Sequence, residues 1–282
     1  MMVNPYDESR LLLALQIDHS RVAGLLAAHW GNEYFAKPEP YASVVLAAQE
    51  HDIGWWEWEM KPSTLNDKGY PLDYHDGSLK YLGQLRLDFY RRAVDHVMQR
   101  DPYAALLIAM HGVALMNAGY GRLAYPPDRS ADPRVKAYIE HQNQLRLKLL
   151  EQLRQSDEFR PFASEEQVWA NYELVEVYDQ FAQFICNRQP LNNSEARPLG
   201  PTPTLNDVPV PVSTGVNPVK LYVEVVSENR AVVKPYPFDV DPLVIGYTAR
   251  LVPKRAYTDG PDFLSEFYKA ERITINRTLA SA

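Results

Sequence analysis

The stretch Glu50-His51-Asp52-Ile53-Gly54-Trp55 decides how this sequence is interpreted, because it places a histidine directly before an aspartate. It follows an apolar, alanine-rich segment, 41–51, that predicts a helix, and Gly54 is typical of a helix end. An imidazole nitrogen and a carboxylate oxygen are both good ligands for zinc, manganese or iron. The pair is therefore a candidate for metal binding, although a single His-Asp pair more often faces solvent or caps a helix.

Two further residues strengthen this hypothesis. His19 lies on the apolar stripe of a helix predicted over 19–30, for which Asp18 is the predicted cap. Asp179 lies among large apolar and aromatic neighbours in a helix predicted over 164–187. A buried carboxylate needs a charge partner or a metal to offset its desolvation. The sequence thus predicts ligands from three helices: His19, His51, Asp52 and Asp179.

The composition limits the classes of protein to consider. The chain has 282 residues, a formal charge of −7 and one cysteine. The acidic balance argues against a nucleic-acid partner, and one cysteine excludes a cysteine-based zinc site. We see neither a signal peptide nor an apolar run of about 20 residues, the length needed to cross a bilayer. We therefore expect a cytoplasmic protein with no membrane partner, and a metal site built from histidine and carboxylate.

The order of the predicted elements indicates a mainly α fold with a small C-terminal β-rich extension packed on it. Helices are predicted over 78–100, 102–118 and 133–155, besides those given above. A proline-rich segment, 189–218, is expected to form an extended connection. Strands are expected over 221–226, 231–236 and 244–252, with a closing helix over 262–272. We divide the chain into a helical domain, the connection and a β-hairpin extension with a short terminal helix: residues 1–188, 189–218 and 219–282.

The order of the candidate ligands resembles the H…HD…D signature of the HD-domain metal-dependent phosphohydrolase superfamily, and His51-Asp52-Ile53-Gly54 resembles its H-D-I-G form. The chain also resembles an uncharacterised family, domain of unknown function 3891. The segments that carry this likeness are Glu50–Trp55, Tyr178–Gln180 and Lys234–Phe238. The resemblance implies an HD-like helical bundle. It also implies one or two divalent ions per site, with iron, manganese, zinc, nickel or magnesium as candidates.

The residue after the H-D-I-G form departs from the superfamily pattern. Many HD hydrolases have a lysine there that contacts phosphate, whereas this chain has Trp55, followed by Trp56 and Trp58. The aromatic side chains indicate a substrate pocket for a flat or apolar group. The alternative is that the tryptophans pack the helix ends together.

Two other histidines are candidates for the site. His111 interrupts an apolar helix and is either a core residue or, as the resemblance implies, a second-metal ligand or a phosphate contact. His75 precedes a helix N-terminus, where it could face an anion or join a second metal, although a polar surface turn is the simpler interpretation. With Asp52 as a possible bridge between two ions, the candidate catalytic residues are Asp52, His75 and His111.

These observations lead to one main functional expectation and two alternatives. We expect a hydrolase of HD type that acts on a small phosphorylated metabolite or nucleotide through metal-activated water. The first alternative is a non-catalytic ligand-binding or regulatory protein, and the second is a di-iron oxygenase-like protein. In each case the partner is a small molecule, expected to be anionic, and a homodimer is compatible with the sequence.

Overall fold

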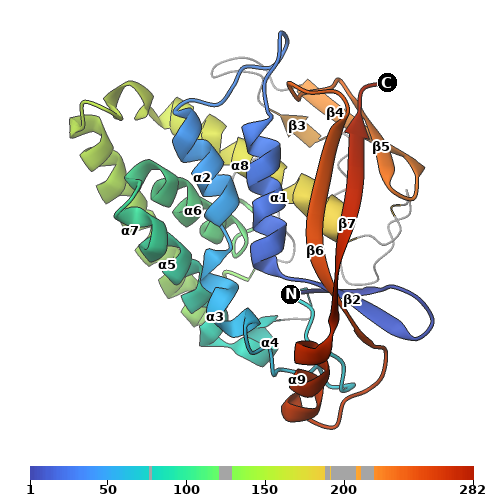
Figure 1. The fold of residues 1–282 in the computed structure, drawn as a ribbon. Coiled ribbons are helices and arrows are strands. Elements are labelled where there is room, and N and C mark those ends of the chain that lie inside the picture. The colour runs from blue at the N-terminus through green and yellow to red at the C-terminus, as the bar shows by residue number, and fades with distance from the viewer. Residues whose placement is uncertain (76–77, 121–128, 188–190, 192–207, 211–218) are drawn as a thin grey trace.

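The computed structural model describes residues 1–75, 78–120, 129–187, 191, 208–210 and 219–282 (Figure 1). The longer helices are α1 (Gln16–Ala28), α2 (Tyr41–Glu50), α5 (Gln84–Met98), α6 (Pro102–Ala114), α7 (Pro133–Gln155), α8 (Glu165–Cys186) and α9 (Gly260–Lys269). Short helices are η1 (Ile53–Trp55), α3 (Trp56–Glu59), α4 (Ser78–Leu82) and η2 (Arg160–Phe162). The strands are β1 (Met2–Pro5), β2 (Arg10–Ala14), β3 (Val208–Val210), β4 (Val219–Ser227), β5 (Arg230–Lys234), β6 (Leu243–Pro253) and β7 (Glu271–Ala280).

Side-chain caps set where several helices begin. Asp101 accepts a hydrogen bond from the backbone of Ala104 at 2.8 Å, and a proline follows it at the first helical position, so α6 starts where the sequence predicts. Ser164 caps α8 in the same way by accepting from Gln167. The predicted cap of α1 at Asp18 is wrong, because that helix already begins after Leu15.

The longest predicted N-terminal helix is interrupted. Instead of one helix over 78–100, the chain forms α4 and α5, and Gly83 between them has a positive φ of 53°. An L-residue with a side chain rarely adopts this conformation, so the glycine marks the break. The break turns α5 so that it packs against η1, beside the His51-Asp52 pair.

The helices pack around α6, on which every residue from Tyr103 to Ala114 is buried. A helix that is apolar on all sides has no solvent-facing stripe and belongs in the centre of a layer. Helices α2, α5, α7 and α8 all pack against α6. Helix α1 lies between this helical layer and the sheet, in contact with α2 and α8 on one side and β6 on the other (Figure 1).

The sheet shows that the expected fold class is wrong. A curled mixed sheet, in the order β1-β2-β6-β7-β5-β4-β3, covers one side of the helices, so the molecule is not a mainly α, HD-like bundle with a small C-terminal extension. About half of the chain is helical and about a fifth is strand. The N-terminal strand β2 pairs with β6, and β7 pairs in parallel with β5. Both ends of the chain therefore build one sheet, which the pattern of any single segment does not reveal.

The individual C-terminal elements agree better with the sequence. The three predicted strands correspond to β4, β5 and β6, the turn at Glu228-Asn229 joins β4 to β5, and the closing helix is α9. Strand β7 was not predicted, although its alternating Ile273 and Ile275 are a strand signal. Most of the predicted connection over 189–218 lies outside the described residues.

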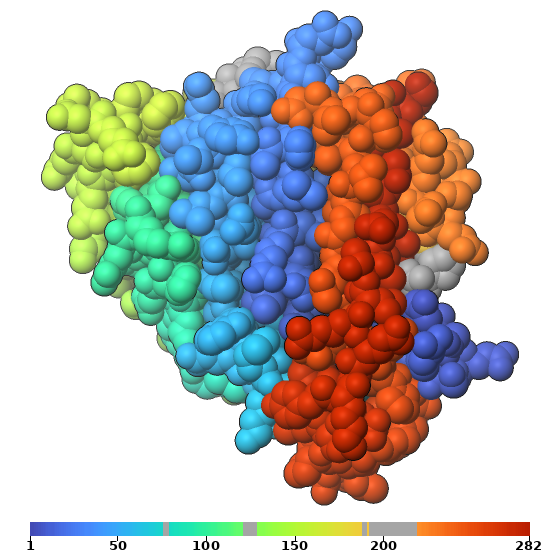
Figure 2. Space-filling view, viewed as in Figure 1, coloured from blue at the N-terminus to red at the C-terminus, as the bar shows by residue number. Residues whose placement is uncertain are grey.

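The paired strands β6 and β7 form a long ridge on the surface beside α1 (Figure 2). On β6 buried and exposed residues alternate along most of the strand, as expected where one face packs on helices and the other meets solvent. Among the described helices, none combines the length and apolarity required to cross a membrane.

Candidate metal centre

Three helices and one turn bring the four predicted ligands together. His19 lies on α1, His51 ends α2, Asp52 precedes η1, and Asp179 lies in the middle of α8. Their side chains are at most 5% exposed. The Nε2 atom of His19 lies 2.7 Å from Asp179 Oδ1 and 4.0 Å from Asp52 Oδ2. The predicted set is thus one buried cluster.

Gly54 explains why the turn after Asp52 can reach this position. A Cβ atom at Gly54 would lie 1.8 Å from the backbone oxygen of Phe89 and 3.0 Å from the nitrogen of Ala93. Only a residue without a side chain permits such a close approach of η1 to α5. The glycine of the H-D-I-G form therefore anchors the His51-Asp52 pair against α5.

The hydrogen bond of His51 leaves one ring nitrogen directed at the carboxylates. Its Nδ1 donates to the backbone oxygen of Ala48 at 2.8 Å. Its Nε2 lies 3.4 Å from Asp52 Oδ2 and 3.4 Å from Asp179 Oδ1, yet makes no hydrogen bond with any described group. A backbone carbonyl that holds the distal N–H of a histidine is the usual outer partner of a metal-binding imidazole.

The charges of the cluster depend on one another. Burial disfavours the charged form of His51, but Asp52 and Asp179 raise its pKa well above the ordinary value. Burial also acts against ionised Asp179, but its contacts with His19 and His51 keep its pKa well below the ordinary value. The same balance lowers the pKa of Asp52, mainly through His51. In the absence of an ion, the cluster thus favours ionised carboxylates facing a protonated His51.

Amide side chains hold both carboxylates in place. Gln183, one turn after Asp179 on α8, donates to Asp179 Oδ2 at 2.8 Å. Gln16, at the start of α1, donates to Asp52 Oδ2 at 3.0 Å. Neither glutamine is predicted from the sequence. The spacing of Gln183 from Asp179 could have indicated it, because residues four apart are neighbours on a helix.

His111 joins the cluster from α6. Its ring centre lies 4.8 Å from that of His51, and its Nδ1 lies 2.7 Å from Oε1 of the buried Glu176. Burial acts against the charged form of His111, but Glu176 raises its pKa. Glu176 is a third site residue, after the two glutamines, that is not predicted from the sequence, and its place one turn before Asp179 is the available signal. The pairing leaves Nε2 of His111 as the nitrogen that can act in the centre.

The donor set fits a divalent ion. Around an ion with ligand distances of about 2.1 Å, adjacent ligand atoms lie about 3.0–3.4 Å apart in octahedral or tetrahedral geometry. The contacts of His51 with the two carboxylates, both at 3.4 Å, fall at the edge of that range. Two overlapping groups have ligand atoms within 4.8 Å of one another: His19, His51 and Asp52, and His51, His111 and Asp179. Nitrogen and carboxylate ligands suit zinc, iron, manganese or nickel better than magnesium, which prefers oxygen.

His75 lies beside this region rather than among the two ligand groups. Its ring centre is 3.9 Å from that of Tyr74. The Tyr74 hydroxyl donates to Gln183 Oε1 at 3.2 Å, and Gln183 in turn contacts Asp179. The segment 73–75 is therefore connected to the ligand cluster through one glutamine.

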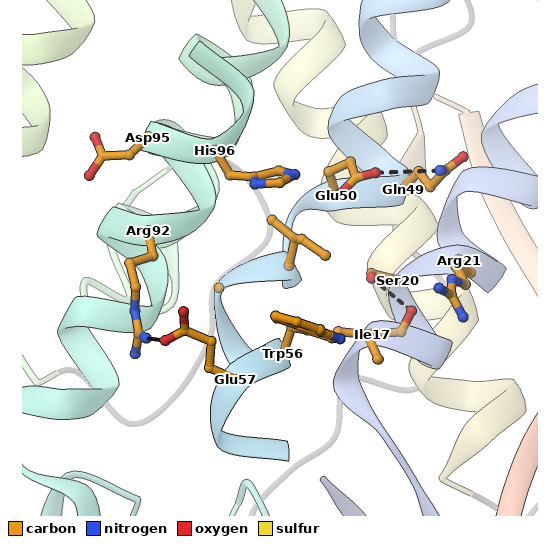
Figure 3. Close-up of a pocket in the computed structure, with 12 residues that line it drawn as sticks. Ile17, Ser20, Arg21, Gln49, Glu50, Trp56, Glu57, Arg92, Asp95 and His96 are labelled. Carbon is orange, nitrogen blue, oxygen red and sulfur yellow. Dashed lines mark hydrogen bonds and ion pairs between the residues drawn. The ribbon is translucent and has the colours of Figure 1, made fainter. Parts of the chain in front are cut away.

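The three tryptophans have different surroundings. Trp55 is 1% exposed and packs on Phe89, with ring centres 4.4 Å apart. Trp58 is partly buried, and its ring centre lies 5.9 Å from that of Trp55. Trp56 is 50% exposed and lines a pocket of about 680 Å³ between α1 and α5 (Figure 3).

This pocket is separate from the ligand cluster. Its walls carry basic and acidic residues, among them Arg21 on α1, Arg92 on α5 and Glu57. The 53–57 segment lies between the two arginines (Figure 3). Ile53 and Gly54 line it, whereas none of the four predicted ligands does. The pocket therefore borders the chain segment that follows Asp52, but the candidate metal centre does not open into it through its ligands.

Comparison with known proteins assigns the chain to a family but not to an activity. Residues 1–254 match the family model "Protein of unknown function (DUF3891)", and the chain belongs to this family. No curated protein and no solved structure matches it significantly.

Proposed function

We propose that this protein is a metal-dependent phosphohydrolase with a centre of HD type, acting on a small phosphorylated metabolite or nucleotide. The observation that carries the proposal is the Nε2 atom of His51. It is buried without a hydrogen-bond partner among the described groups, 3.4 Å from two aspartates on different elements. A metal ion between the three side chains would coordinate this nitrogen and neutralise both carboxylates, as the proton of His51 does when no ion is bound.

The ligand set consists of His19, His51, Asp52 and Asp179. A divalent ion held by these residues would supply Lewis acidity, which activates water and stabilises charge on a phosphoryl oxygen. The hydrogen bonds from Gln16 and Gln183 keep the two carboxylates oriented toward the centre of the cluster. The hydrogen bond of His51 to Ala48 keeps its Nε2 free to coordinate.

His111 is the residue that handles a proton. Glu176 holds its Nδ1 and raises its pKa against the effect of burial. The remaining Nε2 accepts or donates a proton at the centre, as a positioned imidazole does in general acid–base catalysis. The alternative role for His111 is a ligand of a second ion, which it would share with His51 or Asp179.

Elemental analysis of the purified protein tests the proposal. We expect a stoichiometric transition metal in the wild type and its loss in His51→Ala and Asp179→Asn. The control is His141→Ala, because His141 is an exposed histidine on α7. A panel of phosphomonoesters, phosphodiesters and nucleotides then measures turnover, which must follow the metal content across the variants.

Two results would contradict the proposal. If both variants retained the metal of the wild type, the ligand assignment would be wrong. If the metal were present and lost as expected, but no phosphoester were hydrolysed, the protein would be a metal-binding module without hydrolase activity.

A further inference from the structure

A buried arginine lies near the candidate metal centre without an acidic partner. Arg86 is on α5 and is 5% exposed. Its Nη1 donates to the backbone oxygen of Tyr74 at 3.3 Å, and its guanidinium lies 5.9 Å from the ring centre of Tyr90. A guanidinium has five N–H donors, and the Nε donor of Arg86 has no hydrogen-bond acceptor among the described groups.

Arg86 lacks the acidic partner that usually accompanies a buried arginine. No carboxylate oxygen of the described residues lies within 4.0 Å of its guanidinium, and its Nε has no hydrogen-bond acceptor among them. The neighbouring arginines of α5 differ in this respect, because Arg91 pairs with Asp88 and Arg92 pairs with Glu57. Burying an unpaired charge is costly, so a bound anion is the expected compensation.

A second arginine adds positive charge to the same place. Arg129 donates to the backbone oxygen of Leu115 at 2.9 Å. Burial and then the charge of Arg86 lower the pKa of Arg129 to about 10. Arg129 is therefore close enough to Arg86 for the two charges to affect each other.

Two tyrosines, Tyr74 and Tyr90, link Arg86 to the candidate metal centre. The carbonyl of Tyr74 accepts from Arg86, while the hydroxyl of the same residue donates to Gln183, the partner of Asp179. Tyr90 is the second link. Burial raises the pKa of Tyr90. The charges of Arg86 and Arg129 act to lower this pKa, and the charge of Asp52 acts to raise it. Tyr90 also packs beside Gly112, next to His111.

We propose that Arg86 binds a phosphate group of the substrate beside the candidate metal centre. The inference rests on the proposed function for the identity of the substrate, and it names the residue that binds the phosphate. The planar fork of Arg86 matches two oxygens of a phosphate. In this chain Arg86 supplies the positive charge that is absent at Trp55.

Binding of inorganic phosphate, measured by calorimetry on metal-free and metal-loaded protein, tests the inference. We expect Arg86→Gln to weaken phosphate binding about ten-fold or more in both forms, because a charged hydrogen bond is lost. Arg86→Lys retains the charge but not the fork, so we expect an intermediate loss. The matched control is Arg92→Gln, which removes a paired arginine from the same helix. Metal content and thermal unfolding are measured for each variant.

The outcomes separate this inference from the proposed function. Phosphate binding to metal-free protein that depends on Arg86 supports the subsite, even if His51→Ala shows that the metal ligands are assigned wrongly. Equal affinities in the wild type, Arg86→Gln and Arg86→Lys would overturn it, as would no binding to the wild type. If Arg86→Gln does not fold, Arg86→Lys decides, and an affinity equal to the wild type, or to that of Arg92→Gln, overturns the subsite.

Discussion

His19 and Asp179 are 160 positions apart in the chain, yet Nε2 of His19 lies 2.7 Å from Oδ1 of Asp179. The contact forms because α1 and α8 pack directly on each other, with both side chains on the shared face. The same packing faces both residues toward the end of α2, where His51 and Asp52 lie. The cluster is therefore held by the helical layer, and a change in one ligand alters the electrostatic environment of the other three.

Replacing Glu176, the carboxylate that contacts His111, should weaken the candidate metal centre without removing a predicted ligand. We expect Glu176→Gln to lower metal affinity or turnover about 10–100-fold, because Glu176 orients His111 through a 2.7 Å contact. The control is Glu166→Gln, an exposed position on the same helix. Metal titration and kcat/KM measured on both variants check the expectation, and equal values in the two variants would show that the Glu176 contact does not matter for the centre.

The stability of the metal-free protein should fall on both sides of a weakly acidic optimum. The pKa of Asp179 is lowered from 3.8, so its contribution is present above that value and is lost as the pH falls further. The pKa of His51 is raised from 6.5, so its contribution is complete below pH 6.5 and is lost as the pH rises through the raised pKa. Urea unfolding of chelator-treated protein from pH 3 to pH 9 measures this profile.

With metal bound, stability should no longer fall as the pH rises above the optimum of the metal-free protein. An ion binds neutral imidazole, so coordination releases the proton of His51 and becomes tighter as the pH rises. We expect the difference in Tm between loaded and metal-free protein to increase from about pH 6 to pH 9, and to vanish in His51→Ala. A Tm difference that is constant with pH would indicate that His51 is already neutral without metal.

Gly54 should be intolerant of any side chain. In Gly54→Ala the new Cβ would clash with the backbone of Phe89 and must push η1 away from α5, so we expect a loss of about 3 kcal/mol or more in the free energy of unfolding. Gly119→Ala is the control, because its Cβ would have its nearest neighbour at 3.5 Å. Denaturant unfolding compares the two. Similar stabilities would mean that η1 can shift without cost.

The contribution of Asp101, the N-cap of the central helix α6, to stability should be measurable independently of the metal centre. Asp101→Ala removes the hydrogen bond to the Ala104 backbone, and we expect a loss of about 1 kcal/mol with no change in metal content. Asp101→Asn keeps an accepting side-chain oxygen and should retain most of the stability. An effect of Asp101→Ala on metal content would show that the start of α6 controls the position of His111.

Local signals predicted much of the secondary structure. Asp101-Pro102 and Ser164 mark helix starts with specific hydrogen bonds, and the alternation over 244–252 marks β6. Strands β1 and β2 escaped prediction because each is short, although Asp7, whose side chain accepts from the backbone of Ser9 and Arg10, is a turn signal between them. Without them the sequence could only indicate a C-terminal extension, whereas the chain forms a sheet from both ends.

The sequence by itself determined the chemistry that is available: one cysteine, a His51-Asp52 pair at a helix end, and a carboxylate within an apolar helix. Helical periodicity also determined that His19 and Asp179 lie on buried faces. Only the tertiary structure decided that these faces meet, that Glu176 holds His111, and that Arg86 is buried without a carboxylate partner among the described residues. The physical reason is that periodicity specifies which side of a helix is buried, whereas the packing of distant elements specifies what it is buried against.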